Sequence, residues 1–297
     1  MKILALSGGG SNGDWQAGRL KALYEKSYKP DLILGISVGG LNGIIAAIDE
    51  YELLDEIWLN TSNSQIFRKR RNVLIGGNYF FHRIGLTKPF KGVYDTSPLR
   101  KLISKHLLGK VVKTDYYCGI VMIRENEPDA YLKYQINAGD TLSENHVDMI
   151  LATASIPVLF DPVEVGNLMF VDGGIIHQSP LDHIIRTSPA SEVTAIACHN
   201  LDPVRTRQPR DLIQFTEWSV SRLLRNQFVA QWENMKKWNQ AAYQAMQQSM
   251  ELVIDGHKVK YLNLDLHFPP YPLGDSLDFS QSKTSVNFRN GYIGYSS

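Results

Sequence analysis

Residues 4–18 read LALSGGGSNGDWQAG, an apolar strand that runs into a glycine-rich turn and then into a helix. Gly8, Gly10 and Gly13 form the pattern G-x-G-x-x-G, which in many α/β proteins binds the pyrophosphate of a dinucleotide. A second apolar strand follows at residues 31–37, and residues 38–59 have the pattern of a second helix. This strand–helix–strand–helix order predicts an α/β fold with a parallel sheet.

The end of the second strand argues against a dinucleotide site. Such a site needs an acidic residue about 20 positions after the glycines, to bind the ribose hydroxyls. The strand instead ends in GISVG, residues 35–39, where Ser37 stands between Gly35 and Gly39. G-x-S-x-G is the nucleophile elbow, a tight strand-to-helix turn whose glycines let the backbone pack closely. The elbow also places the serine at a helix N-terminus, where the dipole favours developing negative charge.

Acyl transfer explains both glycine motifs, because its tetrahedral intermediate carries an oxyanion. A glycine-rich loop that opens a helix presents backbone N–H groups to such a charge. The expected oxyanion-hole residues are Gly8, Gly9, Gly10 and Ser11. A serine also needs a base, and Asp172 in FVDGGII is the best candidate because Gly173 and Gly174 would let its turn approach another element.

Four ordered segments resemble the patatin-like phospholipase family. They are GGGSNG (8–13), GISVG (35–39), ATASIPVLFDPV (152–163) and DGG (172–174). The resemblance extends over about residues 2–200 and implies a three-layer α/β/α sandwich with a largely parallel central sheet. It also implies a catalytic Ser–Asp dyad without a histidine, which in this sequence is Ser37 and Asp172. No metal or organic cofactor is expected.

The function expected from this resemblance is lipid acyl hydrolysis of the phospholipase A type, on membrane phospholipids. Ser37 would attack the ester carbonyl, and Asp172 would act as general base and then as general acid through an acyl-enzyme. Lysophospholipase, small-ester hydrolase and acyltransferase activities with the same dyad are alternatives. A catalytically idle module that binds a lipid or a partner is a further alternative.

Two residues raise separate questions about this site. Family members usually carry Arg or Lys just ahead of the last glycine of the first motif, whereas this chain has Asn12 before Gly13. A neutral amide offers no full charge, which bears on head-group preference and turnover. His177 follows Asp172 by five residues and would complete the order Ser, Asp, His of an α/β-hydrolase triad. We expect it instead to be a positioned polar side chain or a loop histidine.

Charge and composition limit the partners. The formal net charge of +1 provides no global field for nucleic acid. Residues 67–91 nevertheless lack acidic side chains and interleave arginine and lysine with phenylalanine and tyrosine. This stretch has two interpretations: a peripheral contact with anionic membranes, or a cap whose aromatic rings pack on the core. The sequence does not indicate an oligomeric state.

The remaining expectations concern organisation and location. No repeat or linker divides residues 1–297, so we expect one domain that includes the long helical stretch at 210–252. Cys118 and Cys198 lie in apolar stretches typical of buried, reduced thiols. The histidines and cysteines lack the spacing of metal ligands. No apolar run is long enough for a signal peptide or a membrane span, so we expect a cytoplasmic protein, with or without peripheral membrane attachment.

Overall fold

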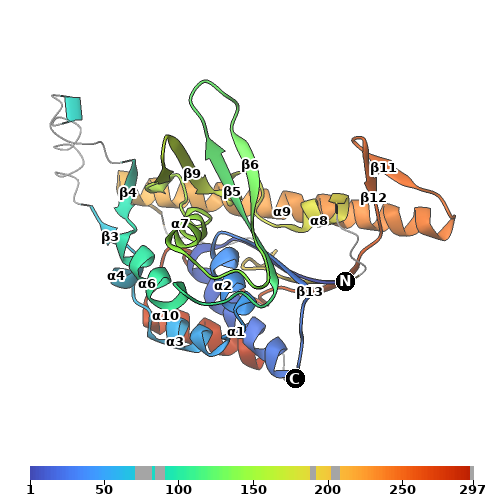
Figure 1. Ribbon diagram of the computed structural model, residues 1–297, viewed down its shortest axis with the longest axis horizontal. Helices are drawn as coiled ribbons and strands as arrows, with labels where there is room; N and C mark the ends of the chain where they lie inside the picture. The colour runs from blue at the N-terminus through green and yellow to red at the C-terminus, as the bar shows by residue number, and fades with distance from the viewer. Residues whose placement is uncertain (71–81, 84–90, 188–191, 202–207, 295–297) are drawn as a thin grey trace.

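The computed structural model describes residues 1–70, 82–83, 91–187, 192–201 and 208–294. Within these residues the main sheet has eight strands in the order β13-β10-β1-β2-β5-β9-β8, and β6 pairs with β5 (Figure 1). The strands are β1 (Lys2–Leu6), β2 (Leu32–Ile36), β5 (Asp115–Ile123), β6 (Ala130–Ile136), β8 (Val163–Val165), β9 (Leu168–Asp172), β10 (Glu192–Ile196) and β13 (Asn263–His267). The five from β13 to β5 run parallel, and β6, β8 and β9 are antiparallel to their neighbours. The prediction of a largely parallel sheet is confirmed.

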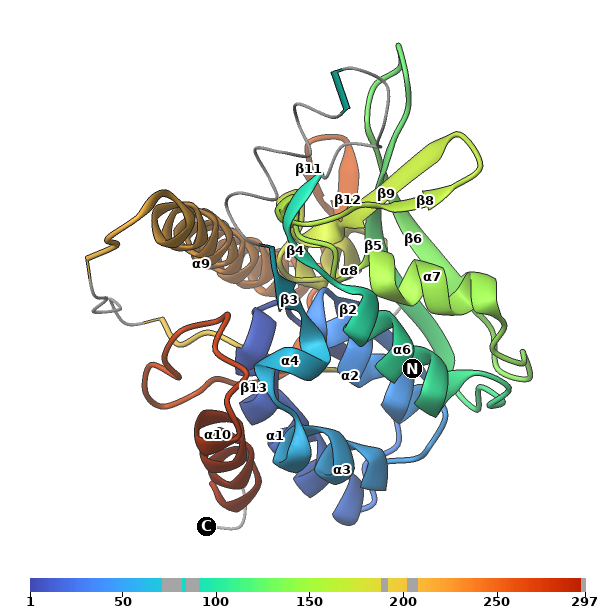
Figure 2. The same cartoon turned by 90° about the vertical axis from the view of Figure 1, so that its left-hand side faces the viewer.

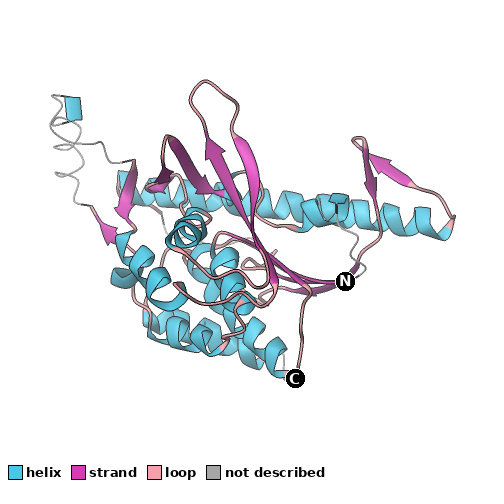
Figure 3. Cartoon of the chain, viewed as in Figure 1, coloured by secondary structure: helices cyan, strands magenta, loops and turns pink. Residues whose placement is uncertain are grey.

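Helices cover both faces of this sheet (Figure 3). One layer contains α1 (Gly13–Glu25), α2 (Val38–Ala47), α3 (Glu52–Asn60), α6 (Ser97–Leu107), α7 (Glu144–Ala152) and α10 (Gln281–Ile293). The other contains α8 (Leu181–Thr187) and α9 (Leu212–Gln247). The long helix predicted at 210–252 is therefore confirmed as α9. None of the helices in the described ranges is both long and apolar enough to cross a bilayer.

Strand β1 shows why its sequence is apolar without interruption. Leu4 and Leu6 pack in the core under α1 and α2, whereas Ile3 and Ala5 pack in the second core under α8 and α9. Successive side chains of a strand point to opposite faces, so a strand covered on both sides must be apolar at every position.

Two helix predictions need correction. Residues 38–59 form two helices, α2 and α3, because Asp49 between them has a φ of 60°, a left-handed conformation that ends a helix. Residues 143–156 also have the sequence pattern of one helix, but α7 ends at Ala152. Pro157 disfavours helical backbone at the residue before it, and the intervening residues instead approach the ends of β2 and β9.

Smaller elements lie beside the main sheet. In the described residues these are α4 (Asn63–Ile66), a sheet of β3 (Arg68–Lys69), β4 (Gly92–Asp95) and β7 (Val158–Phe160), and a hairpin of β11 (Leu252–Ile254) and β12 (His257–Val259). Figure 2 shows β3 and β4 above α4, on the side of the molecule where α2 and α6 also lie.

The last helix, α10, packs directly on α1 although the two are far apart in the sequence (Figure 2). A Cβ atom on Gly18 would lie 2.0 Å from the carbonyl oxygen of Phe288, and one on Gly291 would lie 2.1 Å from that of Trp15. The two backbones therefore touch, and the end of the chain is fixed against the helix that follows the first glycine motif.

Candidate active site

Ser37 occupies the turn between β2 and α2 with φ 55° and ψ −130°. A positive φ is unfavourable for a residue with a side chain and persists only where the surroundings enforce it. Close packing enforces it here, since a Cβ atom on Gly39 would lie 2.4 Å from the carbonyl oxygen of Leu6, and one on Gly35 would lie 2.3 Å from that of Gly39. The local backbone therefore has the strained form of a nucleophile elbow.

The register of the main sheet brings the end of β9, with Asp172, next to the end of β2, which leads into Ser37. Along one edge of β5, Ile36 at the end of β2 pairs with Gly119, and Asp172 at the end of β9 pairs with the next residue, Ile120. Strand β2 is parallel to β5 and β9 is antiparallel, so the carboxyl ends of β2 and β9 meet. A Cβ atom on Gly173 would lie 2.5 Å from the Gly119 carbonyl group, so this turn needs a glycine.

Residues 153–155 form hydrogen bonds with the backbones of Ser37 and Asp172. Thr153 Oγ1 accepts a hydrogen bond from the Ser37 N–H at 3.1 Å and donates one to the Gly119 carbonyl at 2.6 Å. The Ser155 carbonyl accepts from the Asp172 N–H at 3.0 Å. The sequence marked this segment as a motif but did not assign Thr153 a contact.

Asp172 is almost completely buried, with 1% of its surface exposed. Its Oδ1 accepts a hydrogen bond from the Gly174 N–H at 2.7 Å, and its Oδ2 has no hydrogen-bond partner in the described part of the chain. Burial raises the pKa of Asp172 to about 7, while the nearby Ser37 side chain and the hydrogen bond from the Gly174 N–H act in the opposite direction. The carboxyl group can therefore take up or release a proton near neutral pH.

The first glycine motif lies beside Ser37. A Cβ atom on Gly8 would lie 3.0 Å from Ser37 Cβ, and the Gly8 N–H donates to the Gln178 carbonyl at 3.0 Å. Among the described residues, the N–H groups of Gly9 and Gly10 have no backbone or side-chain acceptor. Gly9 and Gly10 therefore remain as candidate oxyanion donors, whereas the Gly8 N–H already has a partner.

The end of this motif faces the C-terminal part of the chain. The Ser11 N–H donates to the Ser276 carbonyl at 2.7 Å, so it is also engaged. Asn12 is buried and its Oδ1 accepts a hydrogen bond from Lys283 Nζ at 3.1 Å. Gly13 opens α1 against the side chain of Val38.

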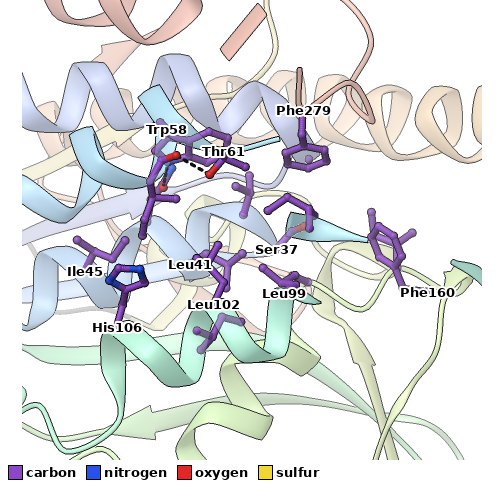
Figure 4. Close-up of a pocket in the computed structure, with 18 of the residues that line it drawn as sticks. Ser37, Leu41, Ile45, Trp58, Thr61, Leu99, Leu102, His106, Phe160 and Phe279 are labelled. Atoms are coloured by element: carbon purple, nitrogen blue, oxygen red, sulfur yellow. Dashed lines mark hydrogen bonds between the residues drawn. The ribbon is translucent and has the colours of Figure 1, made fainter. Parts of the chain in front are cut away.

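An apolar cavity opens at Ser37 (Figure 4). Leu41 and Ile45 of α2, Trp58 of α3 and Leu102 of α6 are among the residues that line it. Ile45 lies eight residues beyond Ser37, which corresponds to about 12 Å along a helix. The cavity is therefore long enough to hold an extended apolar chain beside the serine.

A second cavity borders the same serine and is more polar. Gln178, His199 and Glu217 line it, and Gln178 Oε1 has no hydrogen-bond partner within the described residues. Burial lowers the pKa of His199 to about 4, and the charge of Arg225 acts in the same direction, so the imidazole is neutral at pH 7. Sequence reasoning missed these lining residues because no local pattern marks them.

His177 lies elsewhere. Its ring packs edge-on against Tyr131 of β6, with the centroids 4.8 Å apart, and it is absent from the residues that line the two cavities at Ser37. We still expect His177 to be a positioned polar side chain or a loop histidine rather than a third member of a triad.

The basic and aromatic stretch at 67–91 falls mostly outside the described residues. At its described start, the Phe67 ring packs on Tyr94 and Phe160. The Arg70 guanidinium pairs with Asp161 and donates to the carbonyls of Gly92 and Tyr94. Phe67 and Arg70 are therefore structural, and membrane contact by the rest of the stretch stays a prediction.

Comparison with known proteins identifies the family of this chain. The family model described as patatin-like phospholipase matches residues 4–185, more than half of the chain. The chain belongs to the patatin-like phospholipase family. The matched region contains both Ser37 and Asp172.

Among solved structures, the crystal structure of VipD from Legionella pneumophila aligns with 99% of this patatin-like chain. The identity is 12% and the TM-score 0.37. The alignment covers 66% of the VipD chain, so this chain spans about two thirds of its length. Because the identity and the TM-score are this low, the assignment of the chain to the family rests on the match to the family model over residues 4–185.

The raised pKa of Asp172 leads to a prediction about stability. Between about pH 4 and pH 7 the folded protein holds a proton on Asp172 that the unfolded chain releases, so this residue makes stability fall as pH rises through that window. Asp172→Asn has no charge to bury and can still accept from Gly174. We expect its Tm at pH 8 to exceed that of the wild type by about 3 °C or more, and the gap to narrow at pH 5.

Asp129→Asn, at an exposed carboxylate, serves as the control and should leave Tm unchanged at both pH values. Thermal unfolding followed by circular dichroism measures the difference. A Tm for Asp172→Asn at or below that of the wild type at pH 8 would show that the buried carboxylate is not destabilising.

Proposed function

We propose that this patatin-like phospholipase is a lipid acyl hydrolase that cleaves carboxylic esters, of the phospholipase A type, through Ser37 and Asp172. The observation that carries the proposal is the meeting of a strained serine turn with a buried carboxyl group whose pKa is about 7. Membership of the family supports lipid acyl hydrolase activity in general. The assignment of the two side chains rests on their geometry.

Acylation starts when Asp172 Oδ2 accepts the proton of the Ser37 hydroxyl and Ser37 Oγ bonds to the ester carbonyl carbon. A base with a pKa near the working pH is partly ionised and also returns the proton readily. The negative charge that forms on the carbonyl oxygen would be stabilised by the N–H groups of Gly9 and Gly10. In known cases one such donor contributes about 2.7–4 kcal/mol.

Collapse of the intermediate breaks the ester C–O bond and leaves the acyl group on Ser37. Asp172 gives its proton to the departing alkoxide, which leaves as an alcohol. Asp172 then takes a proton from a water molecule whose oxygen attacks the acyl carbonyl, and the second collapse returns that proton to Ser37 and releases a carboxylic acid. One ester and one water thus yield one alcohol and one acid, and the protein ends as it began.

The two cavities fit the two halves of such an ester. The apolar cavity between α2, α3 and α6 suits the acyl chain, and the polar cavity with Gln178 and Glu217 suits the leaving alcohol. Both border Ser37 and Gly10, so an ester that occupied both would place its carbonyl group between the nucleophile and the candidate oxyanion donors. A catalytically idle binding module would not need two cavities that meet at a serine and a glycine-rich loop.

We expect Ser37→Ala and Asp172→Asn each to lower hydrolysis of a short-chain nitrophenyl ester by at least about 1,000-fold, as removal of a nucleophile or its base does elsewhere. His177→Ala, close to the site in sequence, should keep most of the wild-type kcat. The rate at which each of the three purified variants releases nitrophenol from the ester measures its activity. Wild-type rates in Ser37→Ala would refute the proposal, and a His177→Ala loss as large as that of Ser37→Ala would indicate a triad.

The acyl cavity predicts a chain-length effect. Leu102 is half-buried on α6 and lines the cavity, so Leu102→Trp should fill part of it. We expect kcat/KM for a long-chain ester to fall about 10-fold or more relative to that for a two-carbon ester. Leu108→Trp, at an exposed position just after α6, is the matched control and should leave that ratio unchanged. An unchanged ratio in Leu102→Trp would place the acyl chain elsewhere.

A further inference from the structure

A buried lysine from the end of the chain lies against the first glycine motif. Lys283 of α10 keeps only 12% of its side chain exposed. Its Nζ donates to Ser11 Oγ at 2.6 Å and to Asn12 Oδ1 at 3.1 Å, and lies 3.5 Å from Asp14 Oδ2. An ammonium group has three protons and no acceptor, so these three oxygens use its full capacity.

The segment before α10 holds the same loop through its backbone. The Ser276 carbonyl accepts from the Ser11 N–H at 2.7 Å, and the Asp275 carbonyl accepts from the Ser11 hydroxyl at 3.0 Å. A Cβ atom on Gly10 would lie 2.2 Å from the Ser276 carbonyl oxygen, so the loop is in close contact with this segment. Ser11 is thus bound on three sides by residues 275–283.

We propose that Lys283 is a positioning residue that holds the oxyanion loop, through Ser11 and Asn12, in the conformation that aims the Gly9 and Gly10 N–H groups at the reacting carbonyl. The inference rests on the proposed function of the site. Lys283 acts through the loop, because it is not among the residues that line the two cavities at Ser37.

The loop between β1 and α1 is restrained on both sides of the candidate donors. The Gly8 N–H donates to the Gln178 carbonyl before them, the Asn12 N–H donates to the Gly9 carbonyl at 3.2 Å, and Ser11 is held by residues 275–283. The N–H groups stabilise an oxyanion only if they are directed at it before it forms, because preorganisation is the source of their effect. A firm anchor at Ser11 therefore matters for the transition state more than for substrate binding.

The ammonium of Lys283 also stands where the first glycine motif has no cation of its own. It lies next to Ser11, the residue that follows Gly10, and forms an ion pair with the buried Asp14. Asn12 itself is neutral, and residues 4–185 of the family match do not include Lys283. In this chain the cation beside the loop is therefore supplied by a helix 271 residues away from Asn12.

A purely structural role for Lys283 is the main alternative. Asp14 is completely buried and accepts hydrogen bonds from the Asn287 side chain and the Trp15 N–H. Lys283 could serve only to neutralise it, and removal of one buried partner would then destabilise the fold. The double variant Asp14→Asn/Lys283→Met removes both charges together and leaves no unpaired charge in the interior. A loss of kcat in this variant therefore reports on the positioning role and not on the neutralisation of Asp14.

The experiment measures kcat and KM of the full-length double variant with a soluble short-chain ester at pH 8. A positioning role predicts a kcat about 10-fold to 100-fold lower than wild type, with KM changed by less than about 3-fold, since the lost interaction acts in the transition state. A folded double variant with wild-type kcat would overturn the proposal.

A second variant decides the matter if the double variant does not fold. Ser11→Ala keeps the Lys283–Asp14 pair and removes the shortest contact between the ammonium and the loop. It too should lower kcat with little change in KM, and wild-type kcat in Ser11→Ala would then overturn the proposal.

Lys21→Met is the matched control. Lys21 is another buried lysine of the α1 region, and it pairs with Glu52 and Asp55 of α3, away from the glycine motif. It should lower Tm and leave kcat unchanged, and an equal loss of kcat in Lys21→Met would count against a specific role of Lys283. Ser37→Ala is assayed beside these variants, because activity that survives it refutes the proposed function and not the contact of Lys283.

Discussion

The candidate site depends on how two strands share one edge of β5. Strand β2 pairs with the first half of that edge in parallel, and β9 pairs with the second half in antiparallel orientation. Their carboxyl ends therefore meet at Gly119 and Ile120, and each end carries one of the two side chains, Ser37 and Asp172. Backbone hydrogen bonds set this register, so the pair does not rely on flexible side chains to find each other.

Burial then gives the pair its chemistry. The sheet and its helical layers bury Asp172, which raises its pKa to about 7, and in the proposed mechanism this lets the carboxyl group act as the base without a histidine. This arrangement has a cost in stability, because a charge that would be solvated in the unfolded chain is buried in the folded one. Functional sites commonly carry such a penalty, offset by the rest of the fold.

Much of this could be predicted from the sequence because the signals are local. The glycine motif, the serine turn and the order of strands and helices depend on residues that are neighbours in the chain. Contacts between distant segments had no such signal: Thr153 beneath Ser37, the cavity residues Gln178 and His199, and Lys283 against Asn12. The break between α2 and α3 was missed because the apolar pattern continues through Asp49, whose left-handed backbone ends α2 while the Glu50 N–H donates to the Ile45 carbonyl.

The pH dependence of kcat/KM for a soluble short-chain ester tests the central claim most directly, namely that Asp172 is the base for Ser37. The ionised carboxylate is the active form, so the rate should rise as pH increases, with an apparent pKa of about 7, and then reach a plateau. That rise should be absent from the residual rate of Asp172→Asn. A rate independent of pH between 5 and 9, or the same rise in Asp172→Asn, would contradict the account.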